Sequence, residues 1–326
     1  MSRFNIHTFT ALLAGIAIAS GPSHAGAQAW PDKPVRLIVP YAPGGTTDFA
    51  ARLVAERLSQ QTGRSFFVEN KAGASGTIGT TLAAKSAPDG TTFLVNDTTY
   101  AMLPALLAKL PWDHANDLVP VTTFVVTPVV LVVSANSPFR TAQDLIDHAR
   151  RNPGKLNFGS GGNGSSTHLA AEVLKKEGKL FVTHIPYKGA GDAMVGLLGG
   201  QVDLLITAAP TAVPQVQGGK VRALAVTGDR SLPGLPGVPT FKDVGLPGYK
   251  VTNWFGLAAP RGTPKDIVDR MQSEVAKALS DARVVERLAA LGAQPGGMSS
   301  TEFAAFIRAE TRQWGDISKT AGVRPE

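Results

Sequence analysis

Two adjacent glycines followed by hydroxyl side chains give this sequence its first candidate for binding chemistry. Gly44 and Gly45 precede Thr46 and Thr47, and Asp48 comes next. Glycine lets a backbone turn sharply and approach a ligand closely. Where such a turn leads into a helix, the free N–H groups of the helix start attract negative charge. The loop therefore predicts a binding site for a carboxylate or a phosphate.

The segments on either side of this loop support that interpretation. Residues 35–41 read as a buried strand, and the apolar residues at 49, 53, 54 and 58 recur at helical spacing. Asp48 then falls in the first turn of the helix, where the helix dipole favours a carboxylate. A helix cap is the favoured interpretation of Asp48, ahead of direct contact with a ligand.

Three further glycine-rich turns, at residues 72–79, 159–168 and 186–192, also lie between strand-like and helix-like segments. This alternation predicts an α/β protein with largely parallel sheets. In open α/β sheets the ligand lies beyond the carboxyl ends of the strands, where such loops gather. We expect the two halves of the chain to turn these loops toward one another across a cleft. The polar loop at 96–99 is expected to lie outside the core.

Ser165, Ser166 and His168 offer a nucleophile and a base, so a secreted hydrolase is one alternative. Serines at a helix start more often cap the helix, and we favour that role. Asp203 lies in an apolar run, and a buried carboxylate needs partners. Either a loop N–H or an amino group on a ligand would satisfy it.

Motifs for cofactors and metals are weak or missing. Residues 159–164 satisfy G-x-G-x-x-G, but the acidic residue expected about 20 positions later is missing. The sequence holds no P-loop, no G-x-S-x-G elbow and no H-E-x-x-H. We therefore expect no catalytic residue, no cofactor and no metal.

The composition is that of a well-filled globular protein, with 43% hydrophobic and 17% charged residues. The absence of cysteine excludes disulfides, thiol catalysis and a cysteine-linked lipid anchor. The formal net charge is +7, but no run of five Lys or Arg residues occurs. Without a basic stripe and interleaved aromatic residues, nucleic acid is not an expected partner.

Residues 1–29 predict a secretory signal peptide. Arg3 supplies the positive charge, residues 11–19 form the apolar core, and small residues at 25–29 offer cleavage after Ala27 or Ala29. The apolar core is much shorter than the roughly 20 residues that span a bilayer. We expect the mature protein to be free outside the cytoplasmic membrane.

Several ordered motifs together resemble the receptors of tripartite tricarboxylate transporters, also called the TctC or Bug family. The resemblance runs from about Trp30 to the C-terminal helices. The motifs are W-P-D-K-P-V at 30–35, V-P-Y-A-P-G-G at 39–45, P-D-G-T at 88–91, G-S-G-x-N-G-S-x-x-H-L at 159–169, P-Y-K-G at 186–189, G-G-Q-V-D at 199–203 and W-F-G-L-x-A-P-x-G-T-P at 254–264.

The resemblance implies an α/β periplasmic binding protein of two domains, type II-like, with the ligand cleft between the domains. The first domain is expected to be discontinuous, at 30–127 plus 254–326, and the second at 128–253. Closure like a Venus flytrap is expected to pivot near residues 127 and 253. The mature chain is expected in the periplasm as a monomer.

The function implied is non-enzymatic. The protein would capture a small organic carboxylate (a di- or tricarboxylate, an acidic amino acid or an aromatic acid). It would then deliver this ligand to the membrane components of a tripartite tricarboxylate transporter. A ligand-binding partner of a membrane sensor kinase is the alternative.

In this family the ligand carboxylate is held by loop N–H groups and hydroxyls, with no obligatory arginine. The family often has a third glycine where this chain has Thr46, so the first loop is less open or lends its hydroxyl. Thr98, Thr99, Tyr187 and Trp254 are expected to decide which acid is bound. The candidate ligand-binding residues are Gly44, Gly45, Thr46, Asp48, Thr98, Thr99, Ser160, Asn163, Gly164, Ser165, Ser166, His168, Tyr187, Gly189 and Asp203.

Overall fold

The computed structural model describes residues 30–320. The predicted signal peptide and its cleavage sites lie outside the described residues. Within 30–320, every helix falls short of the length and apolar character that crossing a membrane requires.

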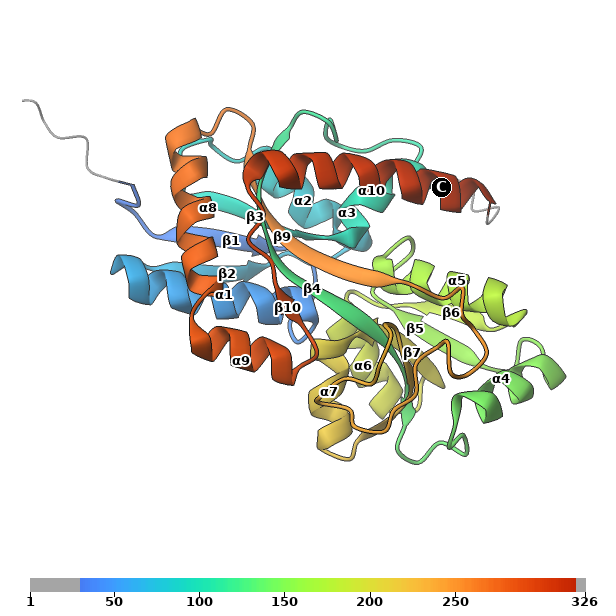
Figure 1. The fold of residues 1–326 in the computed structure, drawn as a ribbon. Coiled ribbons are helices and arrows are strands. Elements are labelled where there is room, and N and C mark those ends of the chain that lie inside the picture. Colours follow the sequence, from blue (N-terminus) through green and yellow to red (C-terminus); the bar gives the residue numbers. More distant parts are fainter. Residues whose placement is uncertain (1–29, 321–326) are drawn as a thin grey trace, which may run out of the picture.

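The strands form one curled sheet that two lobes share (Figure 1). Its order is β2-β1-β3-β9-β4-β7-β5-β6, with β8 and β10 each paired to β4. We call β1–β3, β9, β10 and the first part of β4 the first lobe, and β5–β8 with the last part of β4 the second lobe. The strands are β1 (Val35–Val39), β2 (Phe66–Asn70), β3 (Thr92–Asp97), β4 (Leu118–Ser134), β5 (Asn157–Ser160), β6 (Thr183–Pro186), β7 (Leu204–Ala208), β8 (Val221–Val226), β9 (Thr252–Pro260) and β10 (Gln294–Pro295).

Helices cover both faces of each lobe, and Figure 1 shows α10 running over the first lobe toward α5 of the second. The first lobe carries α1 (Thr46–Thr62), the 3-10 turn η1 (Ala74–Gly76), α2 (Thr77–Ala84), α3 (Thr98–Leu106), α8 (Lys265–Leu279), α9 (Ala282–Ala290) and α10 (Ser300–Thr320). The second lobe carries α4 (Ala142–Arg151), α5 (Ser166–Gly178), α6 (Ala190–Leu198) and α7 (Ala209–Gln217).

Two long antiparallel strands, β4 and β9, join the lobes. They pair from Leu118 opposite Pro260 to Pro128 opposite Thr252. From Val129 onward β4 pairs instead with β7 and β8. This exchange of partners falls one residue from the domain boundary expected between 127 and 128. That the region acts as the hinge of closure stays a prediction.

The four glycine-rich turns fall, as expected, between a strand and a helix: β1–α1, β2–α2, β5–α5 and β6–α6. Apolar side chains of the strands and helices pack into separate clusters in the two lobes. The parallel pairs β1–β2, β1–β3, β5–β6 and β5–β7 bring the carboxyl ends of these strands to the region between the lobes.

The expectation that residues 96–99 lie outside the core is wrong. Asn96 and Asp97 end β3, Thr98 and Thr99 begin α3, and all four are buried. Asp97 has a partner that offsets its burial, because it caps α3 by accepting a hydrogen bond from the N–H of Thr99. The hydroxyl of Thr98 likewise accepts one from the N–H of Trp254 at 2.9 Å. The side-chain amide of Asn96 has no partner among the described residues.

Candidate functional site

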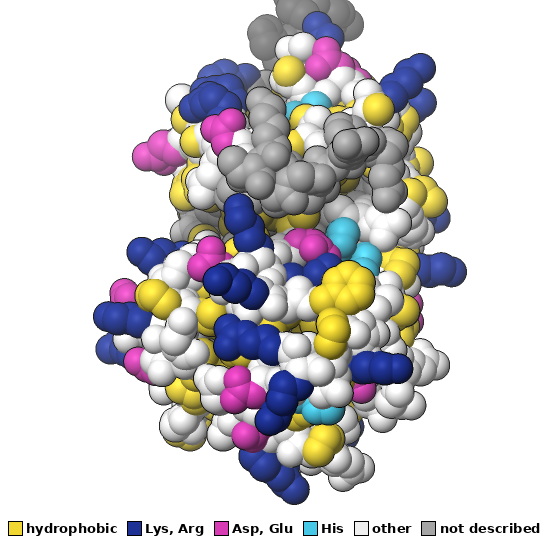
Figure 2. All heavy atoms as spheres, turned by 90° about the vertical axis from the view of Figure 1, so that its right-hand side faces the viewer, with side chains coloured by type: hydrophobic (Ala, Val, Ile, Leu, Met, Phe, Trp, Pro, Cys, Tyr) yellow, Lys and Arg dark blue, Asp and Glu magenta, His cyan; other side chains and the backbone are white. Residues whose placement is uncertain are grey.

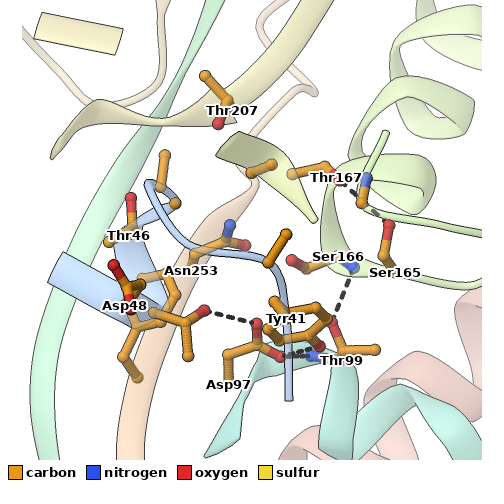
Figure 3. Close-up of a pocket in the computed structure, with 17 residues that line it drawn as sticks. Tyr41, Thr46, Asp48, Asp97, Thr99, Ser165, Ser166, Thr167, Thr207 and Asn253 are labelled. Carbon is orange, nitrogen blue, oxygen red and sulfur yellow. Dashed lines mark hydrogen bonds between the residues drawn. The ribbon is translucent and has the colours of Figure 1, made fainter. Parts of the chain in front are cut away.

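A small cavity of about 30 Å³ lies where the two lobes meet, in a cleft whose empty space, open solvent included, is about 410 Å³. Clefts between domains are common places for small-molecule sites. Its walls come from the carboxyl ends of β1, β3 and β7, from the starts of the helices that follow, and from β9 (Figure 3). Six of the candidate residues line it: Gly45, Thr46, Asp48, Thr99, Ser165 and Ser166.

Helix starts from both lobes converge on this cavity. α1 follows Gly45, α6 follows Gly189 and α7 follows Ala208, and none of the three has a side-chain cap. The free N–H groups of such helix starts carry partial positive charge. Among the described residues that line the cavity, none is Lys, Arg or His. Attraction for an anion therefore comes from the backbone.

Hydroxyl groups fix the start of α5 at the wall of the second lobe. Ser165 caps the helix, because its Oγ accepts a hydrogen bond from the N–H of His168 at 3.2 Å. Thr167 Oγ1 lies 3.1 Å from Ser165 Oγ and accepts from the N–H of Gly161 at 2.8 Å. The capping role favoured for these serines is thus found for Ser165, whereas Ser166 is the first residue of α5 and does not cap it.

The imidazole of His168 faces away from the serine hydroxyls. Its Nδ1 accepts a hydrogen bond from the N–H of Gly164 at 3.0 Å, and its Nε2 lies 3.6 Å from Oε1 of Glu172. A base must lie within hydrogen-bond reach of the nucleophile that it activates. The contacts of His168 therefore do not support the hydrolase alternative.

A second histidine, which the sequence did not single out, supports the same loop. The ring of His184 stacks on that of His168 with centroids 3.9 Å apart. Its Nε2 lies 2.6 Å from Ser160 Oγ, at hydrogen-bond distance. Burial lowers the pKa of His184 to about 4, with the nearby His168 acting in the same direction. The ring is therefore neutral at pH 7 and packs against the base of the loop.

Hydrogen bonds cross between the lobes beside the cavity. Thr46 Oγ1 of the first lobe lies 2.8 Å from Thr211 Oγ1 of the second. The N–H of Ser166 in the second lobe donates to Thr99 Oγ1 in the first lobe at 3.0 Å. Thr46, which replaces the third glycine common in the family, thus uses its hydroxyl in a contact between lobes.

The glycine loops themselves also meet across the cleft. The N–H of Ala42 donates to the carbonyl of Lys188 at 3.0 Å. A Cβ on Gly191 would lie 2.4 Å from the carbonyl oxygen of Pro43. Because both partners are backbone, this close approach requires glycine at 191. Asn163 also bridges the lobes, since its carbonyl accepts from the hydroxyl of Ser75.

Two carboxylates line the cavity, and their environments differ. Burial raises the pKa of Asp48, but hydrogen bonds from Arg52 and Asn70 outweigh it and hold the pKa below its ordinary value. Asp48 also accepts from the N–H of Gly44 at 3.2 Å, which fixes the first loop. Burial raises the pKa of Asp97 above its ordinary value, despite its hydrogen bonds.

Asp97 is one of the residues that the sequence analysis missed. Its Oδ1 accepts from Tyr41 Oη at 3.1 Å and from the N–H of Thr99 at 2.9 Å. Its Oδ2 lies 3.4 Å from the hydroxyl of Thr47. An Asp after a strand and before two threonines is a helix-cap signal, and it was available in the sequence.

Asp203 lies apart from the cavity. Its Oδ2 accepts from the N–H of Asn157 at 2.8 Å, at the start of β5. Asp203 precedes β7, whose opposite end supplies Thr207 and Ala208 to the cavity wall. The carboxylate thus has a backbone N–H as its partner, although this N–H belongs to β5 and not to a loop.

The remaining candidates do not line the cavity. Tyr187 belongs to a neighbouring hollow, and its hydroxyl donates to Gln201. Trp254 packs edge-on against Phe303 and Phe306 in the core of the first lobe. The candidates outside the cavity lining are Gly44, Thr98, Ser160, Asn163, Gly164, His168, Tyr187, Gly189 and Asp203.

Two other lining residues carry polar atoms without partners. Thr207 ends β7 and Asn253 lies in β9, and their side chains are 1% and 2% exposed. Thr207 Oγ1 and Asn253 Oδ1 have no hydrogen-bond partner among the described residues. Neither was singled out from the sequence, because a Thr in a strand and an Asn beside a Trp carry no motif.

The face of the molecule in Figure 2 carries many Lys and Arg side chains, with acidic and apolar side chains between them. Exposed basic residues of the second lobe include Arg150 and Arg151 at the end of α4, and Lys176 and Lys179 at the end of α5. Basic residues near helix C-termini offset the negative end of the helix dipole. The formal net charge of +7 gives mild attraction for small anions.

The two lobes, the strands that join them and the cavity between them define the fold of a periplasmic binding protein. The structure of the periplasmic binding protein BugD matches with a TM-score of 0.87 and 33% identity, covering 91% of this chain and 100% of that chain. The family model described as the tripartite tricarboxylate transporter family receptor, TctC, matches residues 50–323. The chain belongs to this family.

Two similar solved structures contain an organic acid. Rpa4515 of R. palustris with adipate has a TM-score of 0.87 and 37% identity, covering 91% of this chain and 100% of that chain. MatC (Rpa3494) of Rhodopseudomonas palustris with bound malate has a TM-score of 0.83 and 33% identity, covering 88% and 99%. Adipate and malate are both dicarboxylates.

Proposed function

We propose that this protein captures a small organic carboxylate outside the cytoplasmic membrane and delivers it to the membrane components of a tripartite tricarboxylate transporter. The observation that carries the proposal is the convergence of uncapped helix starts on a cavity whose described lining has no cationic side chain. Family membership and the acids bound to Rpa4515 and MatC support it.

Simple energetics agree with this mode of binding. A hydrogen bond from a neutral donor to a charged acceptor contributes roughly 1.5–3 kcal/mol net. Three or four such bonds, together with helix dipoles, reach about −8 kcal/mol, which corresponds to roughly micromolar affinity. An arginine is therefore not needed. Binding and release then require the lobes to close and open about β4 and β9.

A thermal-shift screen of ligand-stripped protein tests the proposal. The panel holds mono-, di- and tricarboxylates, acidic amino acids and aromatic acids. An acid at 100 times its dissociation constant stabilises the folded protein by about 2.7 kcal/mol, which is an easily visible rise in melting temperature. A panel without any rise would contradict carboxylate capture.

Two variants show whether a rise comes from the cavity. Gly161→Val places a side chain against the backbone of Gly189 and Ala190, where an added Cβ already lies 3.4–3.5 Å away. We expect it to abolish the rise. Gly199→Val, beyond the end of α6, is the matched control and should keep it. Deleting the gene and comparing uptake with transcription separates delivery to a transporter from the sensor alternative.

A further inference from the structure

Thr207 and Asn253 stand out because both are deeply buried and both keep a polar atom without a partner. An unpartnered polar atom in the interior costs free energy, and native proteins rarely keep one without a reason. Here the two residues line the same cavity, and they come from strands of different lobes. Figure 3 shows both side chains around the space that Ser166 faces from the other side.

A helix start lies beside this pair. α7 follows Thr207 after one residue, Ala208, and begins without a side-chain cap. The free N–H groups of its first turn add donors next to the Thr207 hydroxyl. The carboxamide of Asn253 offers both an acceptor and a donor, and a threonine hydroxyl can serve as either. Together they suit an oxygen function, whether carboxylate or hydroxyl.

Most of the other polar side chains of the cavity already have partners. Thr46 bonds to Thr211, and Thr99 accepts from the N–H of Ser166. Asp97 accepts from three donors in the first lobe. Thr207 and Asn253 are therefore buried side chains that a ligand satisfies at little cost to existing bonds, and Ser166 faces the same space.

We propose that Thr207 and Asn253 are specificity-determining residues that bind a second oxygen function of the ligand. The inference rests on the proposed carboxylate capture and narrows it. A ligand with an apolar body, such as an aromatic or aliphatic monoacid, leaves both groups buried and unpaired. A dicarboxylate or a hydroxy acid forms hydrogen bonds with both groups. The cavity thus selects against apolar monoacids.

The position of Asn253 links this recognition to closure. Asn253 pairs with Thr127 of β4, next to the place where β4 exchanges its partners in the first lobe for those in the second. Thr207, in contrast, belongs to the second lobe alone. A ligand bound by both residues therefore joins the second lobe to the strand that connects the lobes.

The test compares acids of equal carbon number by isothermal titration calorimetry: succinate with butyrate, glutarate with valerate, and adipate with hexanoate. Wild-type protein should bind at least one diacid ten times or more tightly than its matched monoacid. Thr207→Val, which keeps the shape of the side chain, should weaken that diacid about tenfold and leave the monoacid unchanged or tighter. Asn253→Leu should act in the same direction.

Stability without ligand separates this role from a structural one. Because Thr207→Val removes a buried hydroxyl that lacks a partner, the melting temperature of the stripped variant should equal or exceed that of the wild type. Thr301→Val, at an exposed position in α10, is the matched control and should change neither property.

Two outcomes overturn the inference while leaving carboxylate capture intact. One is equal affinity of the wild type for diacids and matched monoacids. The other is a Thr207→Val variant that binds the diacid as tightly as the wild type. If no acid of any kind binds to the wild type, the proposed function itself fails.

Discussion

Among the residues that line the cavity, Asp97 has the most direct effect on the binding of a charged ligand. Its carboxylate lies beside the place proposed for an anion, so its negative charge would repel that anion. Burial raises its pKa, so the folded state holds the proton of Asp97 more tightly than the unfolded state does. Its contribution to stability is therefore fully present below the ordinary Asp pKa of about 3.9. That contribution is lost as the pH rises through the raised value.

Asp97→Asn should strengthen the binding of the acid found in the screen. The substitution keeps the shape of the side chain and removes one negative charge, which we expect to raise affinity about tenfold, or about 1.4 kcal/mol. Wild-type affinity should also rise as the pH is lowered and Asp97 takes up a proton, and the variant should lose this dependence. Calorimetric titrations over a series of pH values measure both effects.

The control for Asp97 is Asp229→Asn, which removes the same charge from an exposed loop and should leave affinity nearly unchanged. Weaker binding by Asp97→Asn would contradict the repulsion argument. It would instead indicate that Asp97 accepts a hydrogen bond from a cationic group, such as the ammonium of an acidic amino acid.

Among the elements, α6 shows how closely the two lobes approach one another. Gly191 lies in its first turn, where an added Cβ would come within 2.8 Å of Gly45 N as well as within 2.4 Å of Pro43 O. Neither atom belongs to a flexible side chain that could move aside. The approach of α6 to the first loop therefore depends on the absence of a Cβ at position 191.

Gly191→Ala should hinder closure without harming the fold. Alanine in a helix is favoured over glycine by about 1 kcal/mol, so the stability of the stripped protein should not fall. Affinity for the acid should drop tenfold or more, because the first loop must shift before the lobes meet. Gly199→Ala at the end of the same helix, with no atom closer than 3.4 Å, is the control. Unchanged affinity in Gly191→Ala would show that closure tolerates the shift.

The sequence predicts elements best where the chain must satisfy a local rule. The strand expected at 35–41 matches β1 (Val35–Val39), which ends two residues earlier. The apolar residues at helical spacing, at 49, 53, 54 and 58, all fall in α1 (Thr46–Thr62). A capping box at Thr141 and Asp144, which begins α4, is another such local rule.

The same holds for the residues of the candidate site. The glycine turns could be predicted from the sequence, because a close backbone approach requires glycine whatever the tertiary structure. Thr207 and Asn253 could not be predicted, since only strand pairing and the meeting of the lobes bring them to one cavity.

The burial of residues 96–99 was misjudged because their partners are distant in sequence. The hydroxyl of Thr98 accepts from the N–H of Trp254 in β9, 156 residues later. The hydroxyl of Thr99 accepts from the N–H of Ser166.

For the molecule as a whole, an apolar contact between the lobes lies outside the cavity. Met102 and Leu106 of α3 pack with Leu169 of α5 and with Trp314 of α10. Figure 1 shows α10 reaching from the first lobe to the neighbourhood of α5. Because Trp314 is 5% exposed, separation of the lobes would bring its ring into contact with water.

Tryptophan fluorescence should therefore report closure. Adding the bound acid to stripped protein should shift the emission to shorter wavelength, as Trp314 leaves water and packs on Leu169. Trp314→Phe should abolish this shift while the calorimetric signal of binding remains. Trp112→Phe is the control and should keep the shift, since Trp112 stacks on Tyr100 within the first lobe. A shift that survives in Trp314→Phe would mean that α10 and α5 stay in contact when the ligand leaves, and that the lobes do not separate there.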